Sequence, residues 1–128
     1  MDTKEYVQCV LKLKSGNYDK IRAHLSSAQT IDLLHAAMGM DTESGEFMDA
    51  MKKAIFYGKP VDRVNLVEEL GDLMWYVALA AATLEVDLAE VMQKNVDKLK
   101  ARYGGNLDFT ETRALGRDLD RERKILEG

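Results

Sequence analysis

The turn Gly58-Lys59-Pro60 constrains the fold most, because it separates the two longest helical patterns in the chain. Apolar residues recur every three or four positions from about 27 to 57, and Gly39 leaves open whether this run is one bent helix or two. A second pattern runs from about 61 to 85. Glycine suits the left-handed position after a helix, and proline suits the first turn of the next. The sequence therefore predicts two long antiparallel helices.

The remaining segments extend this pair into an all-helical chain. Residues 3–14 show helical spacing, Asp87 caps a helix that runs to about residue 103, and a charged last helix begins at Thr110. The polar part of that last helix, 117–124, is expected to be a solvated face. A single proline and the lack of an alternating strand pattern argue against a β fold. We expect an all-α, antiparallel helical bundle.

The helix predicted at about 61–85 combines an apolar surface with one polar stripe. From Leu73 onward its apolar residues lie on nearly every side, which predicts a central buried element. At about 100° per residue, the polar stripe consists of Asn65, Glu69, Asp72 and Tyr76. A buried carboxylate without a partner costs several kcal/mol, and a second one nearby adds repulsion. Something cationic is therefore expected beside Glu69 and Asp72.

The preceding helix carries a matching acidic pair, Glu43 and Glu46. Residues at i and i+3 share a helix face and packed helices lie ~8–10 Å apart, so the two pairs can converge on shared ions. Oxygen ligands without Cys or His favour Mg²⁺, with Mn²⁺ as the alternative, and four carboxylates predict two or three ions per site. Gly45 and Gly71, one inside each pair, each cost a helix ~1 kcal/mol, which predicts close approach of helices or ligand there.

The helix after Asp87 offers hydrogen-bond donors along the edge of its apolar side. These are Asn95, Lys98 and Arg102. All three suit phosphate oxygens or a base, and Lys98 and Arg102 also fit the alternative of surface cations whose stems lie along the protein. Asn95 lies nearer the core-facing stripe, so it is the stronger candidate for a substrate contact.

Three other side chains have a functional and a structural interpretation. Lys53 lies close to Glu46 around its helix, where it either meets a phosphate or pairs with that glutamate. Trp75 either stacks on a base or belongs to the core, since it lies within an apolar run. His35 lies among apolar residues, so a structural histidine is favoured over a catalytic one.

Charge and composition exclude several classes of function. A net charge of −4 and a pI near 5.2 give no basic face for a nucleic-acid duplex or an anionic membrane. The most apolar stretch, 73–84, is shorter than the ~20 residues that span a bilayer. Charges interrupt residues 1–14, which is wrong for a signal peptide. The lone Cys9 forms no intramolecular disulfide, so we expect a cytoplasmic protein.

The sequence around the acidic pairs resembles the MazG-like nucleotide pyrophosphohydrolases. The spacing of its Glu-x-x-Glu and Glu-x-x-Asp pairs matches that family. Four runs carry the resemblance: 33–39, 43–46, 55–60 and 68–76. Residues 95–103 are similar to the family's third helix, and residues 117–123 to a tail of small or phage-borne members. One departure is Gly104-Gly105, where a proline often follows the aromatic residue.

The resemblance implies an all-α NTP pyrophosphatase that splits (deoxy)nucleoside triphosphates between the α- and β-phosphates. The products are the monophosphate and pyrophosphate. The acidic quartet that binds Mg²⁺ corresponds to Glu43, Glu46, Glu69 and Asp72. Tyr76, four residues after the aspartate, matches a phosphate ligand of the superfamily. We hypothesise that Glu46 is the catalytic residue that orients the attacking water, while Lys53, Lys98 and Tyr76 offset phosphate charge.

Assembly and domain organisation follow from the same resemblance. Such relatives are dimers or dimers of dimers, so we expect a homo-oligomer that completes the core, with a tetramer favoured over a dimer. The predicted single domain, 1–128, has an N-terminal helical segment at 1–29 and catalytic helices at 30–104. A loop and the charged C-terminal helix occupy 105–128. The expected location is the cytoplasm, that of the host if the chain is phage-encoded.

Two other functions fit parts of the pattern. A di-iron carboxylate bundle oxidase also uses inward glutamates, but it needs Glu-x-x-His pairs, and neither His24 nor His35 stands three residues after a glutamate. A non-enzymatic helical interaction module would instead use the acidic stripe as a partner surface. Metal-dependent release of pyrophosphate separates the hydrolase from both alternatives.

Overall fold

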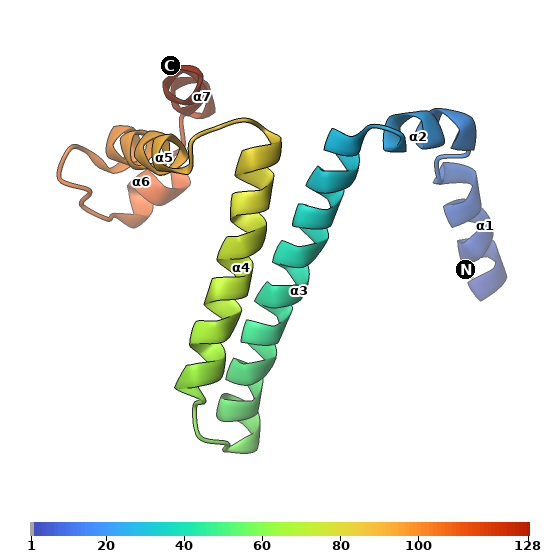
Figure 1. The fold of residues 1–128 in the computed structure, drawn as a ribbon, viewed down its shortest axis with the longest axis horizontal. Coiled ribbons are helices and arrows are strands. Elements are labelled where there is room, and N and C mark those ends of the chain that lie inside the picture. Colours follow the sequence, from blue (N-terminus) through green and yellow to red (C-terminus); the bar gives the residue numbers. More distant parts are fainter. Residues whose placement is uncertain (1) are drawn as a thin grey trace.

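The computed structural model describes residues 2–128, and every regular element in that range is a helix. The predicted all-α class is confirmed. In chain order the helices are α1 (Thr3–Leu13), α2 (Tyr18–Leu25), α3 (Ala28–Tyr57), α4 (Arg63–Thr83), α5 (Leu88–Tyr103), α6 (Glu111–Leu115) and α7 (Leu119–Glu127). Figure 1 shows α3 and α4 as a long antiparallel pair, with α1 and α2 extending from one helix and α5, α6 and α7 grouped beyond the other.

The α3–α4 pair forms from local signals at its ends. Ser27 caps α3 by accepting from the Thr30 N–H, and Gly58 ends it in the left-handed conformation at φ 62°. Asp62 caps α4, so Pro60 lies in the loop rather than in the first turn. Between its caps α3 is one unbroken helix, which answers the question left open at Gly39.

Close approach of α3 and α4 occurs at Gly39. A Cβ atom there would lie 2.3 Å from two ring carbons of Tyr76, too close for any side chain. Cβ atoms at Gly45 and Gly71 would meet nothing within 4 Å in the described chain. The predicted close approach of the helices at these two glycines is therefore wrong, because both face open space, while close approach of a ligand there stays a prediction.

Two helical segments differ from the sequence prediction. The helix α2 lies within the predicted N-terminal helical segment 1–29 but was not predicted as a separate helix, although Asn17 caps it by accepting from the Lys20 N–H. The prediction of a single charged C-terminal helix is wrong. The helix α6 ends at its cap Gly116, and Asp118 begins α7 by accepting from the Arg121 N–H. A charged, periodic run thus becomes two short helices separated by a turn.

The turn before α7 aims Glu122 at α5. Its carboxylate accepts from Arg102 through Nε at 2.8 Å and Nη2 at 2.7 Å, and from Arg117 Nη2 at 2.8 Å. Glu122 is only 5% exposed, so the prediction of a wholly solvated face at 117–124 is wrong. The guanidinium of Arg102, and then that of Arg117, lower the pKa of Glu122 to about 2, and Glu122 in turn raises the pKa of Arg102. This ion-pair cluster fastens α7 to α5.

Replacing Glu122 with glutamine is expected to lower the urea midpoint at about pH 6, because the two arginines lose their anionic partner. The folded-state pKa lies below the ordinary value of 4.5. The stabilisation by this carboxylate is therefore fully present above about pH 4.5 and is lost as the pH falls toward about 2. The measured difference between wild type and Glu122→Gln should shrink over that range.

The matched control is Glu127→Gln, which removes a carboxylate from an exposed i,i+4 pair with Arg123 on the same helix. Exposed pairs contribute little, so its midpoint should stay near that of wild type. A Glu122→Gln variant as stable as wild type at about pH 6 would contradict the proposed role of the cluster.

The hydrophobic core is small within one chain. In residues 2–128 the buried apolar side chains are Ala36 and Ala81. Met74 is 64% exposed and Trp75 is 73% exposed, so the predicted burial of α4 on nearly every side is wrong for the single chain. The reason is that α3 covers one side of α4, while α5 packs against α6 and α7 instead. No helix in the described range combines the length and apolarity of a bilayer span.

Candidate metal centre

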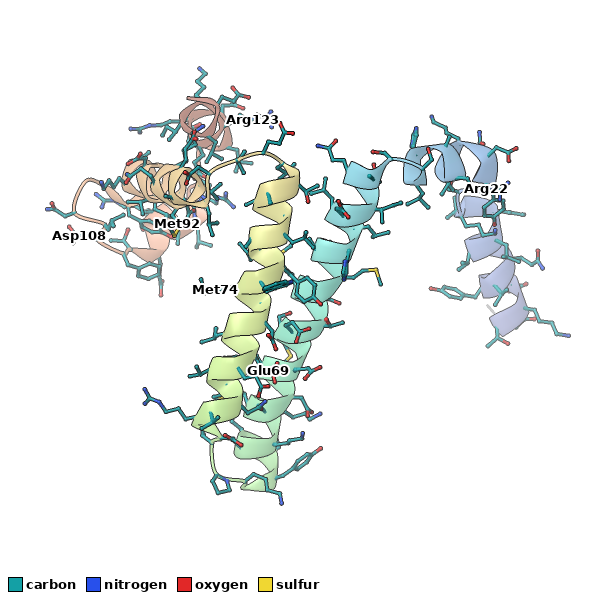
Figure 2. All side chains as sticks on the ribbon, in the orientation of Figure 1. Arg22, Glu69, Met74, Met92, Asp108 and Arg123 are labelled. Carbon is teal, nitrogen blue, oxygen red and sulfur yellow. The ribbon has the colours of Figure 1, made fainter. Side chains whose placement is uncertain are left out.

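Three carboxylates converge where α3 faces α4. One oxygen each from Glu43, Glu69 and Asp72 lies within 4.8 Å of the others. Glu69 is buried, Glu43 is half-buried and Asp72 is exposed, so the group reaches from the helix interface to the surface. Figure 2 shows Glu69 lying between α4 and α3. All donors are carboxylate oxygens, which fits a hard divalent cation such as Mg²⁺.

Two neighbours orient the carboxylates of this acidic cluster. The Asn65 side-chain amide donates to Glu69 Oε1 at 2.6 Å, one helical turn away on α4. The Thr42 hydroxyl also lies 3.3 Å from Glu43 Oε1, although it has a nearer acceptor in the Gly39 carbonyl at 2.9 Å. Sequence analysis placed Asn65 on the polar stripe but assigned it no site role, although its i,i+4 spacing to Glu69 was the available signal.

The fourth predicted metal ligand, Glu46, lies outside the cluster. It lines an adjoining cavity of about 510 Å³ together with Asp49, Lys53, Asn65 and Glu69. Glu43 instead lines a different hollow, together with Asp72, so the two carboxylates of this pair border different cavities. Three of the four predicted ligands converge, and a metal-binding or catalytic role for Glu46 stays a prediction.

Lys53 pairs with Asp49 rather than with Glu46. Its Nζ lies 2.7 Å from Asp49 Oδ2, and Lys52 contacts the same carboxylate at 2.6 Å. Hydrogen bonds from Lys52 and then Lys53 lower the pKa of Asp49 to about 2. The alternative of a Lys53–Glu46 pair is therefore wrong, because the i,i+4 partner is the nearer one. Lys53 still lines the cavity beside Glu69.

A second hollow also borders the acidic cluster. Its volume is about 310 Å³, and Glu43, Asp72, Trp75 and Tyr76 line it. Trp75 is exposed, so it is not part of the core of the single chain. Tyr76 is half-buried, and the ring of His35 packs edge-on against it at 5.6 Å between centroids. The histidine is itself exposed, so its structural role stays a prediction.

The predicted donors on α5 lie elsewhere. Neither Asn95 nor Lys98 lines a cavity that borders the acidic cluster, and α5 groups with α6 and α7 beyond the end of α4 (Figure 1). The guanidinium of Arg102 is engaged by Glu122. The structure therefore does not bring these three residues together with the acidic cluster.

Comparison with known proteins decides the family. The MazG nucleotide pyrophosphohydrolase domain matches residues 33–104, more than half of the chain. The chain belongs to the MazG nucleotide pyrophosphohydrolase family. This confirms the resemblance read from the acidic pairs. The MazG match includes all three residues of the acidic cluster and most of α3, all of α4 and all of α5, while α1, α2, α6 and α7 lie outside it.

One similar relative of this MazG chain is the Gene 37 protein of Mycobacterium phage L5. The two are 40% identical over 74 residues, which cover 55% of this chain and 65% of the relative. The chain thus spans less than two thirds of the length of that relative. No solved structure matches the chain.

Proposed function

We propose that this chain hydrolyses (deoxy)nucleoside triphosphates to the monophosphate and pyrophosphate in a Mg²⁺-dependent reaction. The observation that supports this most is the convergence of Glu43, Glu69 and Asp72 inside the region that matches the MazG family. Carboxylates this close repel one another unless a cation neutralises them. In residues 2–128 no lysine or arginine forms an ion pair with any of the three, which leaves that role to a metal ion.

The metal would be held by these three carboxylates, with Glu46 completing the set from the adjoining cavity. The oxygen-only donors fit Mg²⁺, with Mn²⁺ as a substitute, and we propose two or three ions per site. When bound, the ions supply Lewis-acid polarisation of the α-phosphorus and lower the pKa of a bound water.

The side chains around the acidic cluster divide the remaining tasks. Glu46 orients the water toward the α-phosphorus, since its carboxylate lines a cavity that Glu69 also lines. Lys53, on the same cavity, offsets the charge of the phosphate tail. On the other hollow, Tyr76 contacts a phosphate oxygen and the exposed ring of Trp75 stacks on the base. Asn65 keeps the Glu69 carboxylate oriented through its 2.6 Å hydrogen bond.

The two alternative functions fit these observations less well. The acidic cluster contains no histidine, whereas a di-iron bundle uses Glu-x-x-His pairs. An interaction module would present its acidic stripe to a partner, but Glu69 is only 5% exposed. The proposed substrates place the reaction in the cytoplasm, that of a host cell if the chain is phage-encoded like its relative from Mycobacterium phage L5.

The test is a screen of canonical and modified NTPs and dNTPs with and without Mg²⁺. Pyrophosphate should be released from at least one nucleotide, with the monophosphate as the second product, and excess EDTA should stop the reaction. Release of inorganic phosphate alone would point to a different bond. No turnover of any nucleotide at any Mg²⁺ or Mn²⁺ concentration would favour the interaction module.

We also propose that the chain works as a homo-oligomer, with a tetramer favoured over a dimer. The exposed apolar side chains of α4 support this assembly, because a second chain would bury them. They are Val64, Val67, Leu70 and Met74. A contiguous apolar face of this kind on a helix is typical of a protein interface.

A further inference from the structure

Gly39 and Tyr76 form a close contact between α3 and α4. A Cβ atom built at Gly39 would lie 2.3 Å from Cδ1 and Cε1 of the Tyr76 ring and 2.4 Å from its Cγ. The Cγ atom is fixed close to the α4 backbone, so the ring cannot move aside without changing its rotamer or separating the helices. The ring occupies the place that a side chain at position 39 would need.

This contact lies one helical turn from the acidic cluster. On α3, His35, Gly39 and Glu43 are four residues apart and share one face. On α4, Tyr76 follows Asp72 by the same interval. Because the helices are antiparallel, four residues forward on α3 match four residues backward on α4. The Gly39–Tyr76 contact therefore lies about 6 Å along the pair from the place where Glu43 meets Asp72.

His35 makes a further contact with the Tyr76 ring beside Gly39. The His35 ring packs against Tyr76 with an interplanar angle of 64°, one turn before Gly39. Gly39 itself is buried, and the helix continues through it without a break. A glycine within a helix costs roughly 1 kcal/mol relative to alanine. The ring seated against Gly39 gives a physical reason for having glycine at this position.

We propose that Gly39 is a positioning residue for the acidic cluster. By admitting the ring of Tyr76, it sets the register and spacing of α3 and α4 at which Glu43 meets Glu69 and Asp72. It also holds Tyr76 on the hollow that Glu43 and Asp72 line. The effect of Gly39 on turnover rests on the proposed function, whereas the effect of Gly39 on helix packing and cation binding does not.

The experiment is a double-mutant cycle of Gly39→Ala and Tyr76→Ala in the full chain. The readouts are the urea midpoint, Mg²⁺ affinity by calorimetry and kcat/KM. We expect Gly39→Ala alone to lower the midpoint and to weaken Mg²⁺ binding by about tenfold or more, since misplaced ligands commonly lose that much. In the Tyr76→Ala background the added methyl group meets no ring, so Gly39→Ala should cost nothing further.

Two further variants separate positioning from general helix effects. Tyr76→Phe keeps the ring, so its Mg²⁺ affinity should stay near that of wild type. Gly45→Ala introduces the same methyl group into α3 at a position with open space, so its urea midpoint should equal or exceed that of wild type.

Equal losses from Gly39→Ala in both backgrounds, or no loss at all, would overturn the proposal. If Gly39→Ala does not fold, the double variant should regain helical circular dichroism, and its failure to do so would also overturn the proposal. A wild-type chain that releases no pyrophosphate would contradict the proposed function. The Mg²⁺ affinities and urea midpoints of the variants would still decide the role of Gly39.

Discussion

Replacing Glu69 or Asp72 with alanine is expected to reduce Mg²⁺-dependent pyrophosphate release by about 10³-fold or more. Each change removes one of three converging carboxylates, and the loss of several kcal/mol of charge stabilisation corresponds to a factor of that size. Steady-state release of pyrophosphate from the preferred nucleotide measures the effect.

The same variants should keep their helical circular dichroism. Removing Asp72 from a group of like charges relieves repulsion, so the metal-free Asp72→Ala variant should resist urea at least as well as wild type. Glu69→Ala also leaves the Asn65 amide without its acceptor, so some loss of stability is expected there. Glu68→Ala is the matched control, because Glu68 is an exposed neighbour on α4 outside the acidic cluster. Full activity in either Glu69→Ala or Asp72→Ala, or equal inactivity in Glu68→Ala, would remove the cluster from the site.

Light scattering at micromolar concentration is expected to give the mass of a tetramer, with a dimer as the alternative. The unfolding midpoint should rise with protein concentration, because association stabilises only the folded chain. Met74→Glu should lower the measured mass and the midpoint strongly, since Met74 is exposed in the single chain and becomes buried only if another chain covers α4.

Gln8→Glu adds the same negative charge on α1 and serves as the control for net charge. It should leave the mass unchanged. A monomer whose midpoint does not depend on concentration would contradict the proposed assembly. A Met74→Glu variant that keeps the full mass would place the interface elsewhere on the chain.

Sequence analysis predicted the features that depend on local signals. The α3–α4 pair follows from helical spacing and from Gly58, whose positive φ is required at the end of α3. The acidic cluster was predicted in part, since i,i+3 spacing places Glu69 and Asp72 on one face of α4 and the turn brings Glu43 opposite. The same rule does not reveal which member of a pair faces the neighbouring helix, so it did not show that Glu46 would lie outside the cluster.

Features that depend on the tertiary arrangement were not predictable in this way. Spacing does not reveal which glycine faces a neighbouring helix, so Gly39 was read as a possible bend while Gly45 and Gly71 were assigned the close approach. Glu122 was predicted to be solvated because it lies in a charged run and its partner, Arg102, lies 20 residues earlier in the chain. Lys53 pairs with Asp49 because an i,i+4 spacing brings the two side chains together, and Asp49 lies outside the acidic motif.

The attachment of Glu122 to Arg102 has a consequence for where this MazG unit ends. The family match stops at residue 104, yet a nearly inaccessible carboxylate 18 positions later forms a two-bond fork with a guanidinium inside the matched region. The end of the family match therefore differs from the end of the packed structural unit in this chain. The residues after 104 therefore help to hold α5 in place. A chain truncated at residue 104 would leave the Arg102 guanidinium without its carboxylate partner.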